Sequence, residues 1–401
     1  MMFIEILAAI VVGVSLGIFT GVVPGVHINL VAAVILSLSP LLLKYFTPIS
    51  LAAAIMAMSI THVFVDFIPS IFLGAPSDAT ALAVLPGHKL LLEGRGYEAV
   101  VLSATGGFFG LNLVILLLPL LLVVVRHVFS AVKPYIGIIL AGIVFYNVLR
   151  EKGMQMKLWS FAIFLSAGML GVLTLGIPNL NQPLLPLLAG LFGISTLLAS
   201  ALRNTAVPIQ VSEVKAIKKS EAVKSVAAGA FSGGLMGIFP ALGPAQAAML
   251  ARNLIGKAGK RAYLVTLGAV STSSMLFGLI TLFAIDKARN GSIAMMSEIV
   301  NVDGMVFVLL IAVAILAGAA ALMLTSVIGK TFARNIHKID YKRISFAIML
   351  FVAALTFYFS QLTGLLILLT GTAIGLFTIT KSIARYNLMG CLMLPVIIYY
   401  F

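Results

Sequence analysis

The sequence is poor in charge and in cysteine. Only 9% of its 401 residues are Asp, Glu, Lys or Arg, whereas soluble globular proteins carry about 25%. A surface in contact with water needs those charges, so a soluble fold is excluded and lipid is the expected solvent. The single cysteine, Cys391, excludes an intrachain disulfide and a metal cluster held by cysteines.

Two catalytic signatures are missing as well. The sequence contains no complete Gly-x-x-x-x-Gly-Lys-Ser/Thr phosphate-binding loop and no His-Glu-x-x-His pair. ATP hydrolysis and zinc-dependent proteolysis are therefore not predicted. We expect no enzyme activity and no cofactor, apart from a sodium ion or a proton as a coupling ion.

Positive charge is in excess, with 26 Lys and Arg against 12 Asp and Glu. These cations lie in short gaps between apolar runs, which is typical of the cytoplasmic loops of membrane proteins. Membrane topology therefore explains them better than nucleic-acid binding. The excess also favours an anionic substrate or contact with anionic lipid headgroups.

Apolar runs of membrane-spanning or nearly spanning length fill the sequence, and its mean hydropathy is +1.17. This pattern predicts an all-α polytopic protein of the cell membrane. The expected helices are 3–22, 28–43, 49–68, 98–125, 134–149, 158–176, 184–202, 225–239, 244–255, 262–285, 304–329, 344–359, 362–380 and 386–401.

The chain divides at its most hydrophilic stretch. Residues 203–224 predict a cytoplasmic linker between a first membrane repeat, 1–202, and a second, 225–401. Residues 69–80 contain two prolines and several small polar residues, which predicts a turn or re-entrant hairpin buried in protein. Residues 86–96 are interpreted as an aqueous loop.

Two apolar runs, one in each half, are broken by proline and glycine. Proline removes a backbone donor and glycine permits unusual backbone angles, so each break frees peptide groups inside the membrane. Broken helices at corresponding positions of two halves indicate a transporter's binding site. The expected substrate-binding residues are Pro24, Gly25, His27, Asn29, Pro240, Gly243 and Gln246. An alternative for the two amides is hydrogen bonding between helices, and for His27 a structural role.

Glycines at four-residue spacing precede both breaks. Aligning Pro24 on Pro240 superimposes one stripe, Gly13, Gly17 and Gly21, on a second, Gly229, Gly233 and Gly237. Placing the basic loops in the cytoplasm makes the two halves enter the membrane from opposite sides, which predicts an inverted-topology repeat. The glycines alone are equally well explained by close helix packing.

Ionisable and hydroxyl residues near the first break could couple transport to an ion. His62 and Asp66 lie four residues apart on one helical face, and an ionisable residue inside the membrane suggests function. Ser77, Asp78 and Thr80 offer oxygen ligands for sodium, or a carboxylate for a proton. The alternatives are a mutually satisfied pair for His62 and Asp66, and a helix cap for Asp78.

Several stretches resemble the large membrane subunit of the tripartite tricarboxylate transporter family. They are Gly21 to Gly25, Gly74 to Thr80, Pro86 to Lys89 with Glu93 to Ala99, and Ala189 to Ser195. Their order and spacing carry the resemblance, which covers most of the first half.

The second half resembles the family less closely. Ala241 follows Pro240 where the family pattern has glycine, and the chain is short for the family. The resemblance implies a secondary carrier that takes citrate-like acids from a soluble binding protein, with a small membrane subunit beside it.

These observations predict an ion-coupled secondary transporter of a di- or tricarboxylate that works by alternating access. One alternative is a translocase of a lipid phosphate such as polyprenyl phosphate, which would use a cavity open sideways to lipid. A second is an intramembrane enzyme acting on lipid intermediates, which would need His62, Asp66 and Asp78 to converge.

Overall fold

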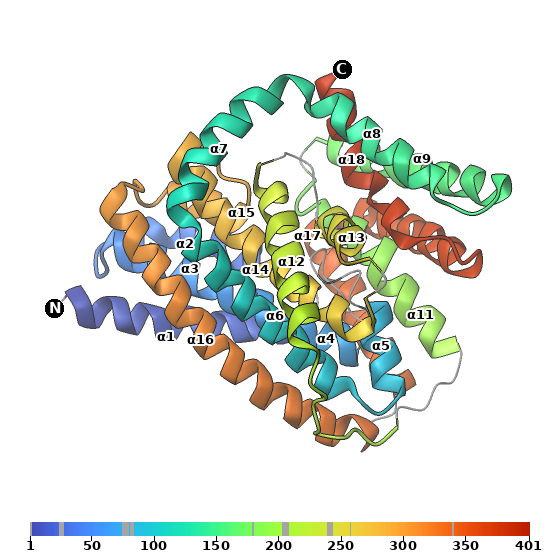
Figure 1. Ribbon diagram of the computed structural model, residues 1–401, viewed down its shortest axis with the longest axis horizontal. Coiled ribbons are helices and arrows are strands. Elements are labelled where there is room, and N and C mark those ends of the chain that lie inside the picture. Colours follow the sequence, from blue (N-terminus) through green and yellow to red (C-terminus); the bar gives the residue numbers. More distant parts are fainter. Residues whose placement is uncertain are drawn as a thin grey trace.

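The chain forms α-helices joined by short loops (Figure 1). The computed structural model describes residues 2–23, 28–73, 80, 84–178, 180–202, 208–238, 244–256, 258–338 and 341–401. The α-helices in these ranges are α1 (Met2–Val22), α2 (Ile28–Leu42), α3 (Pro48–Val65), α4 (Phe67–Phe72), α5 (Val84–Leu92), α6 (Gly96–Leu116), α7 (Leu118–Val132), α8 (Ile136–Leu149), α9 (Met154–Gly176), α10 (Leu184–Leu188), α11 (Ser195–Leu202), α12 (Lys219–Ile238), α13 (Pro244–Ile255), α14 (Lys260–Ile285), α15 (Gly291–Ser297), α16 (Gly304–Asn335), α17 (Tyr341–Thr380) and α18 (Gly390–Tyr400). The described residues form no strand, so the all-α prediction is confirmed.

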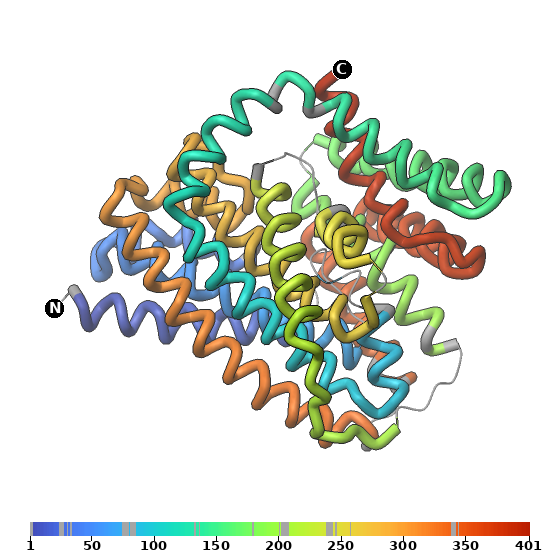
Figure 2. Tube along the Cα trace, viewed as in Figure 1, coloured from blue at the N-terminus to red at the C-terminus, as the bar shows by residue number. Residues whose placement is uncertain are grey.

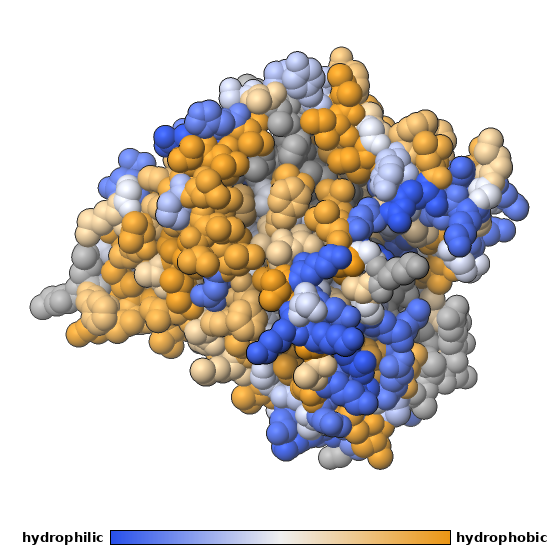
Figure 3. Space-filling model, viewed as in Figure 1, coloured by the Kyte–Doolittle hydropathy of each residue, from blue (hydrophilic) through white to orange (hydrophobic). Residues whose placement is uncertain are grey.

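Seven helical segments in these ranges are long and apolar enough to cross a membrane. They are α1, α3 with α4, α6, α9, α14, α16 and α17. The segment α3–α4 is buried throughout, whereas α16 and α17 expose large apolar residues such as Val308 and Leu350. In Figure 3 apolar side chains cover much of the surface, and hydrophilic ones gather near the start of α12. The chain is therefore a multi-pass membrane protein.

The helices form two bundles with separate apolar cores. The first bundle contains α1–α7 and α12–α16, and the second contains α8–α11, α17 and α18. Helix α7 leads over the top of the view to α8, α9 and α18, which lie to one side of the first bundle (Figures 1 and 2). Each half of the sequence contributes helices to both bundles.

The glycine stripe of α1 is the contact face with α3. A Cβ on Gly17 would lie 2.7 Å from the carbonyl oxygen of Met58, and one on Gly21 would lie 2.7 Å from Val65 Cβ. Only glycine permits two backbones to approach so closely. Because Gly13 meets Ala54 and Gly21 meets Val65, α1 and α3 run parallel.

The second stripe makes the equivalent contact. A Cβ on Gly233 would lie 2.6 Å from the carbonyl oxygen of Val270, and one on Gly237 would lie 2.4 Å from Phe277 Cβ. Gly229 meets Thr266, so α12 and α14 also run parallel. In both halves the glycines therefore lie at close helix–helix contacts, as the packing alternative proposes.

The two parallel pairs point in opposite directions. The Phe283 and Phe307 rings stack 4.3 Å apart where α14 ends and α16 begins, so α16 returns antiparallel to α14. At its other end α16 places Phe332 6.0 Å from Phe72, the last residue of α4. Helix α16 therefore runs with α1 and α3 and against α12 and α14.

Three details differ from the sequence expectations, and a fourth agrees with them. The run at 98–125 is two helices, because Pro119 lacks the amide that would continue α6. Residues 84–92 form helix α5 rather than a loop, since Leu90 and Leu91 are buried against the first bundle. The linker is shorter than expected, because α12 begins at Lys219. The runs at 344–359 and 362–380 are separated as expected, because α17 is interrupted at Gln361, whose φ of 53° and ψ of −152° are not helical.

Candidate functional site

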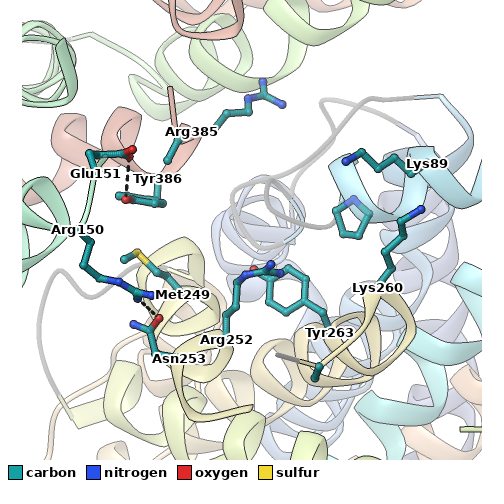
Figure 4. A pocket seen from close by; sticks show the side chains of 13 residues that line it. Lys89, Arg150, Glu151, Met249, Arg252, Asn253, Lys260, Tyr263, Arg385 and Tyr386 are labelled. Carbon is teal, nitrogen blue, oxygen red and sulfur yellow. Dashed lines mark hydrogen bonds between the residues drawn. The ribbon is translucent and has the colours of Figure 1, made fainter. Parts of the chain in front are cut away.

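A cavity of about 670 Å³ lies between the two bundles (Figure 4). It is lined by Pro86, Lys89, Arg150, Glu151, Met249, Arg252, Asn253, Ala258, Lys260, Tyr263, Ala384, Arg385 and Tyr386. We call it the cation pocket, because its lining contains five Lys and Arg side chains and one carboxylate. Such an imbalance in a concave site concentrates anions.

Four segments that are distant in sequence, two of them α-helical, meet at the cation pocket. Lys89 comes from α5, Arg150 follows α8, Arg252 lies in the last turn of α13, and Arg385 follows α17. Lys260 begins α14 on the same side. Because these regions are basic, the positive-inside pattern predicts a cytoplasmic position for this end of the molecule.

Several of the cations have weak or neutral partners. Lys260 pairs with Glu93 at 2.6 Å, and both side chains are nearly half exposed, so this pair contributes little stability. Arg150 donates to the amide oxygen of Asn253, across the boundary between the bundles (Figure 4). Arg252 stacks over the Tyr263 ring, with Cζ 4.9 Å from the ring centroid. Among the described residues, an anion entering the pocket would therefore meet Lys260, Arg150 and Arg252 paired with a half-exposed carboxylate, an amide and an aromatic ring.

Arg385 is the most deeply buried of these cations, with 6% of its surface exposed. Its Nη2 donates to Phe192 O at 2.9 Å and to Thr196 Oγ1 at 2.5 Å. Burial lowers the pKa of Arg385 to about 10, so it stays charged at neutral pH. Its guanidinium points away from the centre of the pocket toward α11 (Figure 4). Arg385 therefore joins α11 to the pocket wall.

Glu151, the carboxylate that lines the pocket, is also hydrogen-bonded. Tyr386 donates its hydroxyl to Glu151 Oε1 at 3.2 Å, and Ser160 approaches the same oxygen at 3.4 Å. Burial and the Glu151 charge raise the pKa of Tyr386 above its ordinary value. Glu151 is thus held against the second bundle.

A second polar group lies in the first bundle, where α3 meets α4. His62 Nδ1 is 3.1 Å from Thr20 Oγ1. Thr80 Oγ1 donates to Asp66 Oδ2 at 3.3 Å. All four residues are at most 6% exposed. The structure therefore places Thr80 beside Asp66 and Thr20 beside His62, two contacts that the sequence did not predict.

Most residues of the predicted breaks lie outside the described part of the chain. These are Pro24, Gly25, His27, Pro240 and Gly243, together with the predicted ion ligands Ser77 and Asp78. Gln246 belongs to the first turn of α13, and its side chain lies outside the described part as well. Asn29, in the first turn of α2, packs against Gly291 and not in the cation pocket.

Comparison with known proteins identifies the class of membrane protein. Residues 7–390 match the family described as "Tripartite tricarboxylate transporter TctA family". The chain belongs to the TctA family. This confirms the resemblance seen in the sequence and extends it through the second half.

A relative of the TctA-family chain is known from Methanocaldococcus jannaschii. It is described as "Uncharacterized protein MJ1079" and is 29% identical over 409 residues, which cover 98% of each chain. No solved structure matches the chain.

Sequence reasoning did not select the residues of the cation pocket. The sequence pattern predicts a loop at Lys89, and membrane topology accounts for Arg252, Lys260 and Arg385. The signal that could have indicated the pocket is the large number of basic loops predicted on one side of the membrane. Linear spacing does not show that these loops surround one cavity.

Proposed function

We propose that this TctA-family chain is an ion-coupled secondary transporter of an organic anion, most simply a di- or tricarboxylate. The observation that carries the proposal is the cation pocket, with five Lys and Arg side chains and one carboxylate between two bundles. A compact anion with several carboxylates matches that charge and that volume.

The architecture supports alternating access between two inverted halves. In each half a glycine-striped helix packs in parallel on a buried helix, α1 on α3 and α12 on α14, and the two pairs point in opposite directions. In the second bundle, glycines of the first half pack closely against helices of the second half. Gly171 of α9 meets Cys391 of α18, and Gly190 of the first half meets Leu368 of α17. Such pairing is expected of two repeats related by a two-fold axis in the membrane plane.

In both pairs the buried neighbour extends well beyond the last glycine of the stripe. Gly21 lies level with Val65, and α4 continues to Phe72, about 10 Å farther at 1.5 Å per residue. Gly237 lies level with Phe277, and α14 continues to Ile285, about 12 Å farther. These positions support helix ends within the membrane, where peptide groups can bind substrate and ions.

The transporter is proposed to act in the cell membrane and to receive its substrate as family members do. The TctA family belongs to tripartite systems, so a soluble substrate-binding protein and a small membrane subunit are the proposed partners. The cation pocket then represents the side from which the anion is released.

A binding screen on the purified protein tests the substrate class. Citrate and related acids are compared with a short-chain polyprenyl phosphate, each with and without sodium. We expect saturable binding of a di- or tricarboxylate that Arg252→Gln weakens. Binding of the lipid phosphate alone would replace the proposal by lipid-phosphate translocation, and binding of neither would reject it.

A further inference from the structure

We propose a sodium-ion site in the first bundle, formed by oxygen atoms of Asp66, Ser70 and Thr80 beside the end of α1. This inference rests on the proposed function and assigns its coupling ion to particular residues. Ser70 was not among the residues that the sequence suggested. The structure places it between the other two.

The oxygen atoms lie within hydrogen-bonding distance of one another. Ser70 Oγ is 2.5 Å from Thr80 Oγ1 and 2.8 Å from the carbonyl oxygen of Asp66. Thr80 Oγ1 is 3.3 Å from Asp66 Oδ2. One carboxylate, one carbonyl and two hydroxyl oxygens therefore converge from α4, the residue before it and the segment that leads to α5. Hard cations take ligands of these kinds.

Burial and charge favour a monovalent ion. Ser70 is 0%, Thr80 1% and Asp66 6% exposed, so water does not screen the carboxylate. One carboxylate balances the charge of sodium, whereas tight divalent sites generally use more acidic ligands. The described residues also contain no group of three His, Cys, Asp or Glu that could hold a metal ion.

The end of α1 is the second observation that points to a cation. Gly21 packs on Val65, and a Cβ there would lie 3.2 Å from the backbone nitrogen of Asp66. Helix α1 ends at Val22, so its C-terminal peptide groups lie at the level of Asp66. The C-terminal end of a helix carries a partial negative charge. Half-helix C-terminal ends coordinate sodium or protons in other secondary transporters.

A buried hydroxyl pair between α3 and α15 lies outside the proposed sodium site. Ser59 donates to Ser292 at 2.9 Å, and both residues are fully buried. This pair joins α3 to α15 without a carboxylate. Ser59→Ala therefore removes a buried hydroxyl of α3 without removing a proposed ligand, and it is the matched control.

The test measures sodium binding to the purified protein in the absence of any organic anion. Radioactive sodium binding and thermal unfolding are recorded across sodium chloride concentrations, with choline chloride keeping the ionic strength constant. The variants are Ser70→Ala, Thr80→Val and Thr80→Ser, with Ser59→Ala as control. Size-exclusion chromatography confirms that each variant is folded.

We expect the unmodified protein to bind sodium and to unfold at a higher temperature in sodium than in choline. Ser70→Ala and Thr80→Val should each raise the sodium concentration for half-maximal effect by about tenfold or more. Thr80→Ser keeps the hydroxyl and should stay within a few-fold of the unmodified protein, as should Ser59→Ala.

Three results would overturn the sodium site. The first is no sodium binding by the folded, unmodified protein. The second is sodium binding that Ser70→Ala and Thr80→Val leave unchanged. The third is stabilisation that follows pH and not sodium, which would indicate a proton site. Citrate binding is measured separately, so retained sodium binding without citrate binding would reject the proposed substrate and keep the ion site.

Discussion

Gly291, at the start of α15, packs directly against the side chain of Asn29 in the first turn of α2. A Cβ on residue 291 would lie 2.8 Å from Asn29 Cγ and Oδ1, closer than real side chains approach. The neighbouring Ser292 accepts a hydrogen bond from Ser59. Helix α15 follows the end of α14 that lies away from the cation pocket. The protein is therefore closely packed on that side.

Gly291→Ala should destabilise the protein because the Asn29 side chain must move. The expected cost is at most about 1 kcal/mol, the lower end of the range for overpacking, because the obstructing atoms are the end of a flexible side chain. Asn29→Ala removes the obstructing atoms, so the double variant should recover most of the loss. Thermal unfolding of the unmodified protein, the two single variants and the double variant measures this coupling. Additive losses in the double variant would show that the two residues do not constrain each other.

The glycine stripes should tolerate no side chain. Gly17→Ala and Gly233→Ala place a methyl group within 2.7 Å of a carbonyl oxygen, and backbone atoms move less easily than side chains. Each change should lower stability by about 1–3 kcal/mol. Gly142→Ala is the control, because nothing lies within 4 Å of its added Cβ. Equal melting temperatures for all three variants would contradict close packing as the role of the stripes.

The sequence predicted the helical class and most of the helices, because apolar runs between basic loops follow directly from the lipid solvent. It also matched Gly17 with Gly233, since repeated small residues remain visible in a linear pattern. It did not predict α5. Leu90 and Leu91 stabilise that helix by packing against the first bundle, and this contact outweighs the Pro86-Gly87 pair inside the helix.

Two glutamates near the start of α6 should differ sharply in their contribution to stability. Glu98 is fully buried and accepts from Arg95, from Arg261 and from the backbone of Lys215. Glu98→Gln should therefore cost up to about 3–5 kcal/mol, because it leaves the largely buried Arg95 and the partly exposed Arg261 without their carboxylate. Glu93 is half exposed, and Glu93→Gln should cost at most about 1 kcal/mol. Similar unfolding temperatures for both variants would contradict this assignment.

The effect of His88 on stability should depend on pH. Burial lowers the pKa of His88 below 6.5, and a hydrogen bond to the Ile71 backbone only partly offsets this. Between the folded and unfolded pKa values the unfolded chain binds the extra proton, so stability falls as pH decreases below about 6.5. His88→Gln should flatten this part of the profile. A variant whose melting temperature falls between pH 7 and pH 5 as steeply as that of the unmodified protein would disprove the prediction.

The candidate site was predicted only in part, because its two components depend on different kinds of information. Asp66 and Thr80 are close enough in sequence for a helix break to bring them together. Arg150 and Arg252 meet only through the packing of two bundles, which local patterns do not encode. Membrane topology also explained their charge, so the sequence offered no reason to seek a second role.

The most direct test of the account is citrate uptake into proteoliposomes that contain Arg252→Gln or Lys330→Gln, together with the proposed partner proteins. Both variants remove one cation from the basic side, but only Arg252 lines the cation pocket. We predict that Arg252→Gln lowers uptake at least about tenfold, by loss of a charged contact worth about 1.5–3 kcal/mol, and that Lys330→Gln leaves it unchanged. Equal uptake by the two variants would contradict an anion pathway through the cation pocket.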